Sequence, residues 1–296
     1  MKVTILGTNG LLSTTIAKYC NQWGIELNMY GRRPPTQNYC SAFYKTDFMT
    51  DKIDCNQLRQ TDVIIYAIGA GIQSNLNDSA EAVYTLNVTV PVSICNSLKK
   101  VRYRGTFISF GSYFEIGERC SHSLFTEEDV LKSLSPAPND YTVSKRMLTR
   151  FISSYKHDFV HWHFILPTIY GEAENPKRLI PYTVHAIRNN EQLHFTSGNQ
   201  TRQYLYVKEV PLLLSSAFRN VLPDGIYNIQ GNETLTVKQI VTLIHQCFGK
   251  MLPEGCFGTE QRTDEKMKYL ALDGHKLESL TGFKANTELK DVILRY

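Results

Sequence analysis

The residue pair with the clearest chemical potential is a tyrosine followed four positions later by a lysine, Tyr141 and Lys145. They lie in a helical pattern over residues 140–155, and this spacing puts both side chains on one face of a helix. An ammonium group favours a nearby phenolate, so we expect Lys145 to lower the pKa of Tyr141 from about 10 toward neutrality. Such a phenol is a suitable proton donor for reducing a carbonyl group. Taken alone, the pair more often marks a solvated helix face.

A second pattern opens the chain, where an apolar run at residues 3–6 is followed by glycines at positions 7 and 10. Glycines let the backbone approach a pyrophosphate, and the N-terminus of the following helix favours its negative charge. A small residue, Ser13, stands where the usual third glycine would be and still permits close helix packing. The pattern predicts a dinucleotide site whose contacting residues are Gly7, Thr8, Asn9, Gly10, Leu11 and Leu12.

The end of the expected second strand, residues 25–30, favours one dinucleotide over another. A site for NAD usually has an acidic residue about 20 residues beyond the glycines, where it binds the ribose 2′-hydroxyl. Here Arg32 and Arg33 follow the strand instead. Guanidinium groups match the geometry of a 2′-phosphate, so we predict NADPH/NADP as the cofactor and keep NAD as the less favoured alternative. A pair of exposed loop arginines would give the same sequence.

These residues need a regular framework to position them. Apolar strand patterns alternate with helical patterns over residues 3–166, which predicts an α/β fold with a Rossmann-type doubly wound parallel sheet. Residues 1–170 are expected to form the NADP-binding domain, and residues 171–296 mainly a smaller, interleaved substrate lobe. A helix and a strand within residues 203–230 are expected to return to the main sheet.

The composition argues against several other classes of protein. A net charge of +4 without a basic run does not point to nucleic acid. The seven cysteines contain no C-x-x-C pair, so we interpret them as reduced thiols and expect no metal site. The first residues run straight into a strand without a signal peptide, and no apolar run is long enough to cross a membrane. We therefore expect a cytoplasmic protein.

Taken in order, these and further motifs resemble the extended short-chain dehydrogenase/reductase family, in its NAD(P)-dependent nucleotide-sugar epimerase/dehydratase group. The resemblance covers nearly the whole chain. GTNGLLS is similar to the family's glycine turn, LNVTVP to its NVxGT segment and NDYTVSK to its YxxxK helix. FISFGSYFEIG resembles the serine strand, LPTIYGE the strand after the active site, and GIYNIQGNETLTVKQI the late strand and helix.

The resemblance implies a role for particular residues. Tyr141 would be the proton donor, and Lys145 its electrostatic partner and a contact of the nicotinamide ribose. Ser112 would hydrogen-bond the substrate carbonyl, with Ser109 as the competing candidate. The further cofactor contacts that it implies are Asp47, Phe48, Ala67, Ile68, Gly69, Asn87, Pro167 and Thr168. The substrate contacts that it implies are Ser112, Arg178, Ile180 and Arg202, with the two arginines binding a nucleotide diphosphate.

The residues after Ser112 narrow the reaction within this resemblance. Dehydratases of the family carry an Asp-Glu pair there, whereas this chain has Tyr113 and Phe114. The segment TSGNQTRQYLYVKEV is similar to CDP-paratose and CDP-abequose synthases, which reduce a 4-keto deoxysugar nucleotide. We therefore predict an oxidoreductase that uses NADPH to reduce the 4-keto group of a nucleotide-diphospho-6-deoxysugar. The product would serve deoxysugar, O-antigen-type polysaccharide or lipopolysaccharide precursor biosynthesis.

Two other functions stay open on the sequence. One is an NAD-dependent nucleotide-sugar 4-epimerase, which would hold NAD tightly. The other is a non-catalytic NADP-sensing regulator, although relatives of that kind commonly lose the tyrosine or lysine that this chain keeps. Helical patterns at residues 78–100 and 140–155 resemble the pair that forms a four-helix dimer interface in the family, so a homodimer is expected.

Overall fold

A single parallel sheet organises the N-terminal part of the chain. The computed structural model describes residues 1–296 apart from 73–76 and 120–121. The strands of its larger sheet are all parallel and stand in the order β3-β2-β1-β4-β5-β6-β9. They are β1 Lys2–Leu6, β2 Glu26–Gly31, β3 Ala42–Lys45, β4 Val63–Tyr66, β5 Thr106–Ser112, β6 Val160–Leu166 and β9 Gly225–Asn228.

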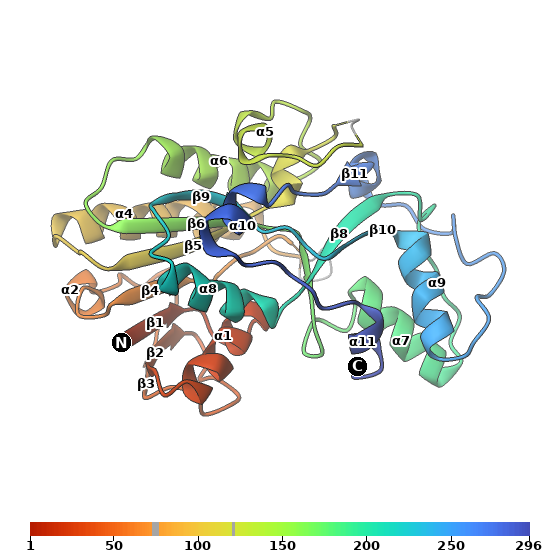
Figure 1. Cartoon of the computed structure of the whole chain (residues 1–296), viewed down its shortest axis with the longest axis horizontal. Helices are drawn as coiled ribbons and strands as arrows, with labels where there is room; N and C mark the ends of the chain where they lie inside the picture. Colours follow the sequence, from red (N-terminus) through yellow and green to blue (C-terminus); the bar gives the residue numbers. More distant parts are fainter. Residues whose placement is uncertain (73–76, 120–121) are drawn as a thin grey trace.

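Helices cover both faces of this sheet (Figure 1). One face carries α1 Leu11–Gln22, α8 Glu209–Arg219 and α10 His275–Thr281. The opposite face carries α2 Cys55–Leu58, α3 Ala80–Tyr84, α4 Val90–Lys100, α5 Glu127–Lys132 and α6 Asp140–Ser154. The predicted doubly wound parallel α/β fold is therefore confirmed. Strand β9, from the segment expected to return to the sheet, pairs with β6.

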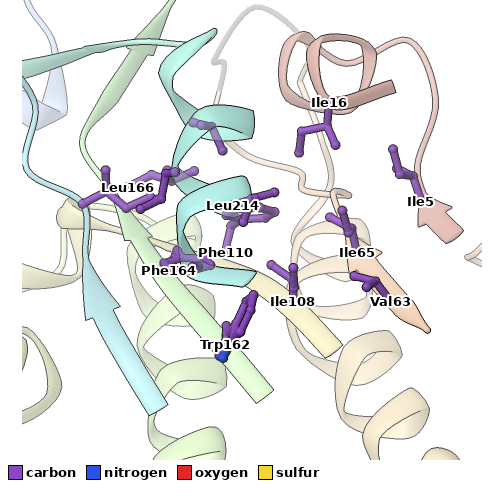
Figure 2. Close-up of a cluster of buried hydrophobic side chains, with 14 of the residues drawn as sticks. Ile5, Ile16, Val63, Ile65, Ile108, Phe110, Trp162, Phe164, Leu166 and Leu214 are labelled. Carbon is purple, nitrogen blue, oxygen red and sulfur yellow. The ribbon is translucent and has the colours of Figure 1, made fainter. Parts of the chain in front are cut away.

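An apolar core lies between the sheet and the helices α1 and α8 (Figure 2). Side chains that alternate along β5 and β6 supply much of it: Ile108, Phe110, Trp162, Phe164 and Leu166. Leu214 of α8 and Ile16 of α1 close over them. Burial of this apolar surface, at about 25 cal/mol per Å², is the main force that fixes the sheet against its helices.

The long helix expected over residues 78–100 is interrupted. A π-helical turn, η2 Thr85–Thr89, separates α3 from α4. Pro91 follows at the first positions of α4 and has no backbone N–H, so the regular hydrogen-bond ladder cannot run unbroken through this point. The turn buries Asn87 and points its amide at the loop after β4.

The remaining elements form a second lobe beside the sheet. Its small sheet has the order β10-β8-β11, with β7 also pairing β8. These strands are β7 Thr168–Tyr170, β8 Thr201–Tyr206, β10 Glu233–Thr236 and β11 Tyr269–Leu270. Its helices are α7 Leu179–Asn189, α9 Val237–Cys247 and α11 Lys290–Ile293. Figure 1 shows this lobe on the right, beyond the carboxyl ends of β5 and β6.

Candidate active site

Helix α6 carries the predicted proton donor and its partner. Asn139 caps the helix by accepting a hydrogen bond from the Thr142 N–H at 3.0 Å. Tyr141 and Lys145 are both buried, which excludes the alternative of a solvated helix face. The Lys145 Nζ donates to the Phe110 carbonyl at 2.8 Å and lies 5.8 Å from the centre of the Tyr141 ring. The structure thus brings the pair together against the end of β5.

The predicted direction of the pKa shift of Tyr141 is wrong. Burial raises the pKa of the Tyr141 phenol to about 12, and the Ser112 hydroxyl and Arg178 oppose this rise only in part. Burial also lowers the pKa of Lys145 to about 8, because the ammonium group loses its water in the interior. The four-residue spacing does not reveal how deeply the pair lies. Because its pKa is raised, the phenol keeps its proton at neutral pH, as a proton donor must.

Ser112 ends strand β5 next to Tyr141. Its hydroxyl is near enough to favour the ionised form of the Tyr141 phenol, and it accepts a hydrogen bond from the Phe114 N–H at 3.3 Å. The competing candidate, Ser109, is fully buried and its hydroxyl is bonded to His161 and His163. Ser112 is therefore the better placed of the two to meet a substrate carbonyl beside Tyr141.

Aromatic side chains occupy the two positions after Ser112. The Tyr113 hydroxyl is 2.5 Å from the Thr168 Oγ1, and the Phe114 ring meets the Tyr141 ring edge-on at 6.0 Å between centres. Phe114 has no ionisable group, and burial raises the pKa of Tyr113 above its ordinary value, so neither side chain is ionised at neutral pH. The segment therefore shapes an apolar wall beside the phenol and supplies no acid–base pair.

The predicted substrate residues lie in the second lobe and differ in accessibility. Arg178 precedes α7, and its Nε is 3.2 Å from a carboxylate oxygen of Glu174. Its charge favours the ionised forms of both Tyr141 and Tyr113, which puts it on the active-site side.

Arg202 is buried in β8 and donates to the backbone carbonyls of Met267 and Asp264. Ile180 is buried in the core of the lobe. Their substrate contacts stay predictions.

The glycine turn has the backbone shape that its sequence predicts. Gly7 has a φ of +115°, which favours glycine, and Gly10 stands at the N-cap of α1. The Thr8 hydroxyl donates to the Arg33 carbonyl at 2.8 Å, and a Cβ on Gly31 would collide with that hydroxyl. Leu11 and Leu12 begin α1. The turn and the end of β2 are thus held in direct contact.

The two arginines after β2 are exposed beside this turn. Asn9 fixes their loop, because its amide donates to the Pro34 carbonyl at 2.9 Å and accepts from the Thr36 N–H at 2.8 Å. Within the part of the chain that the structure describes, neither Arg32 nor Arg33 forms an ion pair. Their charges are available to an anion at this position.

The other predicted cofactor residues follow the carboxyl ends of neighbouring strands, where ligands of open α/β sheets bind. They are Asp47 and Phe48 after β3, Ala67, Ile68 and Gly69 after β4, and Pro167 and Thr168 after β6. Asn87 lies deeper: its amide bonds both backbone groups of Ala70 and the Ser144 hydroxyl. It joins the loop after β4 to α6. Cofactor contacts by all these residues stay predictions.

One carboxylate at the base of the site, that of Glu115, was not predicted from the sequence. Glu115 is fully buried in η3 Tyr113–Ile116, and its Oε1 accepts from the Ser112 N–H at 2.8 Å. Burial raises its pKa, while Thr149, the Ser112 N–H, Lys145 and Arg146 oppose that rise. The available signal was an acidic residue inside an apolar segment, which a surface turn would also explain.

Over residues 1–72, 77–119 and 122–296, no cluster of ligating side chains could hold a metal ion. None of the helices in these ranges combines the length and apolar character that a membrane span requires. The expected homodimer and cytoplasmic location stay predictions.

A family model described as the NAD dependent epimerase/dehydratase family matches residues 3–229. The chain belongs to this family. The predicted resemblance to extended short-chain dehydrogenases/reductases is thereby confirmed, and the protein is an enzyme-family member with a Rossmann-like sheet.

Curated relatives in this family include a CDP-abequose synthase from Yersinia pseudotuberculosis, 25% identical over 218 residues, which are 71% of this chain and 70% of that protein. A CDP-abequose synthase from Salmonella muenchen is 26% identical over 145 residues, covering 48% of this chain and 43% of that protein. Among solved structures, MoeE5 in complex with UDP-glucuronic acid and NAD has a TM-score of 0.82 at 17% identity, covering 99% of this chain and 97% of that one. The Bordetella bronchiseptica enzyme WbmG in complex with NAD has a TM-score of 0.80 at 15% identity, with 99% and 92% covered. At these identities the solved structures establish the fold alone.

Proposed function

We propose that this protein uses NADPH to reduce the 4-keto group of a nucleotide-diphospho-6-deoxysugar. The observation that carries the proposal is the buried cluster of Ser112, Tyr141 and Lys145 at the carboxyl end of β5. A protonated phenol next to a serine hydroxyl suits protonation of a carbonyl that accepts hydride. The similarity to CDP-abequose synthases supports a nucleotide-linked deoxysugar as the substrate.

The neighbouring residues disfavour elimination of water. Tyr113 and Phe114 offer no carboxylate at the positions where family dehydratases resemble one another in an Asp-Glu pair. Glu115, which follows them, is bonded to the Ser112 N–H and buried below the strand end. Arg178, half-exposed at the start of α7, supplies a cation that suits the substrate diphosphate.

The loop after β2 supports NADPH over NAD. Arg32 and Arg33 are exposed next to the glycine turn, and no carboxylate follows β2 where a ribose 2′-hydroxyl would be bound. Charge-assisted bonds from guanidinium to phosphate are among the strongest that proteins form, at about 1.5–3 kcal/mol each. An NAD-dependent 4-epimerase would be expected to keep an acidic residue at this position.

The residues divide the work of the reaction. NADPH, when bound, supplies the hydride to C4. The Ser112 hydroxyl orients and polarises the carbonyl, and the Tyr141 O–H gives its proton to the oxygen as negative charge develops there. Lys145, held by the Phe110 carbonyl, stabilises the phenolate that remains. Positioned acid catalysis of this kind contributes roughly 10²–10⁴-fold to the rate.

The test is NADPH oxidation with 4-keto-6-deoxysugars linked to CDP, dTDP, GDP and UDP. We expect Tyr141→Phe to lower turnover by at least about 100-fold and to leave NADPH affinity nearly unchanged. Replacing Arg32 and Arg33 together by alanine should weaken NADPH at least about tenfold and NADH little. A fully active Tyr141→Phe variant would refute the assignment, and tightly bound NAD in the purified protein would favour the epimerase.

A further inference from the structure

A continuous line of polar side chains runs inside the protein between α6 and the strands β5 and β6. The Ser109 hydroxyl is 2.8 Å from the His161 Nε2 and 2.7 Å from the His163 Nδ1. The other nitrogen of His163, Nε2, is 2.9 Å from the Thr149 Oγ1. Ser109, Thr149, His161 and His163 are each at most 1% exposed. No bulk water separates one group from the next.

Glu115 stands at one end of this line. The nearby Thr149 hydroxyl favours the ionised form of its carboxylate. Gly111 leaves room for the approach: a Cβ there would be 2.6 Å from the Glu115 Oε1 and 2.8 Å from the His163 Nε2. The carboxylate therefore meets the histidine and threonine across a position that has no side chain.

Both ends of the line carry a buried atom without a partner. Among the residues that the structure describes, the Glu115 Oε2 and the His161 Nδ1 are buried and make no hydrogen bond. A buried polar atom left unpaired costs about 1–3 kcal/mol. Such atoms at both ends, with His161, Ser109, His163 and Thr149 hydrogen-bonded in sequence between them, are what a line with two alternative proton arrangements would show.

The line also reaches the catalytic pair. Tyr141, Lys145 and Thr149 are spaced by four residues on α6 and are all buried, so they form one stripe of the helix. Glu115 accepts from the Ser112 N–H, and the Ser112 hydroxyl is near enough to Tyr141 to favour its ionised form. Glu115 thus lies between the catalytic residues and the histidines.

Hydrogen-bond directions in this line are coupled. A hydroxyl has one proton and a neutral histidine has one N–H, so each group can donate in only one direction along the line. With Glu115 ionised, the Thr149 proton turns toward the carboxylate, His163 and His161 carry protons on Nε2, and the His161 Nδ1 is bare. With Glu115 protonated, every bond reverses and both rings carry protons on Nδ1. The two arrangements differ by one proton, gained at the His161 Nδ1 and delivered to the Glu115 carboxylate.

We propose that Glu115, Thr149, His163, Ser109 and His161 form a proton-transfer chain that replenishes the Lys145–Tyr141 pair after each reduction. This proposal rests on the proposed function. The hydride forms the new C–H bond, the Tyr141 proton forms the O–H bond, and the phenolate recovers a proton from the Lys145 ammonium. The Glu115 carboxyl then reprotonates the Lys145 amine, and the chain returns one proton from the His161 end to Glu115. These residues do not contact the substrate and act only by restoring the proton of the Lys145–Tyr141 pair.

The surroundings fit this direction of transfer. Lys145 and Arg146 of α6 are the cations that favour ionised Glu115. Burial holds the pKa of His161 at about 3 and that of His163 well below its ordinary value, so both rings are neutral and differ only in tautomer. At the far end, the His157 ring is 5.8 Å from that of His161, and its Nε2 is 3.8 Å from the partly exposed Asp224 carboxylate. An ionisable ring and a surface carboxylate therefore lie beyond the His161 end of the line.

The first arm of the test needs no substrate. Ring ¹⁵N spectra of the histidines are recorded as the pH rises from about 5 to about 10, a range that begins near the ordinary carboxyl pKa. We expect His161 and His163 to change together from Nδ1–H to Nε2–H in the wild type. Both should keep one tautomer in Glu115→Gln and in Thr149→Val, which removes the connecting hydroxyl. Glu118→Gln, the same change on a neighbouring glutamate, should leave the switch intact. Exposed His194 serves as the internal reference.

The second arm uses a substrate that the wild type reduces. In Glu115→Gln and Thr149→Val, we expect kcat to fall about tenfold or more with KM little changed, and the first turnover to slow much less than kcat. Glu118→Gln should match the wild type. Fixed tautomers in the wild type across the range, or unchanged kcat in both chain variants, would overturn the proposal. The spectra decide it even if Tyr141→Phe proves active, so the two proposals fail separately.

Discussion

Strands β5 and β6 have two faces of opposite character. Toward α8 they present Ile108, Phe110, Trp162, Phe164 and Leu166, a continuous apolar surface (Figure 2). Toward α6 the alternate positions of the same strands include Ser109, Gly111, His161 and His163. Both faces are fully buried. Side chains on both sides of the sheet are therefore shielded from solvent, and the two sides differ in the polarity of those side chains.

The apolar and polar faces of β5 and β6 contribute differently to the stability of the fold. An apolar face contributes to folding in proportion to the area that it buries. A buried polar face gains little net free energy even when its bonds are made, and each unpaired group costs about 1–3 kcal/mol. The polar face lies under the helix that carries Tyr141 and Lys145. This position supports the proposal that its residues serve the reaction more than the fold.

The largest effect is expected from breaking the apolar face. Phe164 is fully buried and contacts the rings of Phe110, Trp162 and Tyr227. Phe164→Ala should lower the free energy of unfolding by about 3–5 kcal/mol, because it removes apolar contacts and leaves a cavity. Urea unfolding followed by circular dichroism measures this change.

The control for Phe164 is Leu212→Ala on an exposed part of α8, where a change within about 0.5 kcal/mol is expected. The coupled tautomer switch of the histidines should survive Phe164→Ala in the folded fraction. A loss of stability no greater than that of the control would contradict the assignment of stability to this face.

A smaller effect is expected where the polar face has no side chain. A Cβ on Gly111 would lie 2.5 Å from the Ile165 Cδ1 and 2.6 Å from the Glu115 Oε1. Gly111→Ala should therefore cost about 1–3 kcal/mol through overpacking and push Glu115 away from His163. Thermal unfolding and turnover measured together test this, with Thr106→Ala at the partly exposed start of β5 as the control. A variant with normal stability and normal turnover would show that the close approach is unimportant.

Short sequence motifs made much of the predicted cofactor-binding domain, residues 1–170, predictable. The glycine turn, the strand before it and the Tyr141–Lys145 spacing each lie within a few residues, and local geometry is what sequence periodicity encodes. The interruption at Thr85–Thr89 was missed, because a π turn has no apolar period of its own. The pKa of Tyr141 was assigned the wrong direction because burial depends on residues distant in sequence.

The polar chain was not predictable for the same reason. Ser109 and His163 are 54 residues apart, and Thr149 reaches His163 from a helix between them. A histidine inside an apolar strand is more often a core residue with ordinary bonds than part of a chain. Only the pairing of β5 with β6, which sets Ser109 opposite His163, brings the groups into line.

The smallest effect concerns the dependence of stability on pH. The pKa of His161 is about 3 in the folded protein and about 6.5 when unfolded, so between these values only the unfolded chain takes up this proton. The wild type should therefore lose stability as the pH falls from about 6.5 toward about 3, by up to about 1.4 kcal/mol per unit for this one proton. His161→Phe removes the proton and should flatten the slope by that amount. Urea unfolding at several pH values between about 7 and about 5 measures it.

The buried carboxylate works in the opposite direction. Glu115 has a raised pKa in the folded protein, so it adds stability below its ordinary value of about 4.5 and loses it as the pH rises above that value. Because the proposed chain couples Glu115 to His161, the slopes are also compared in the Glu115→Gln background, where this contribution is absent. Exposed His185→Phe is the matched control and should keep the wild-type slope. Equal slopes for the wild type and His161→Phe would mean that this ring takes up a proton inside the fold, and the polar face would then be wetter than the apolar one.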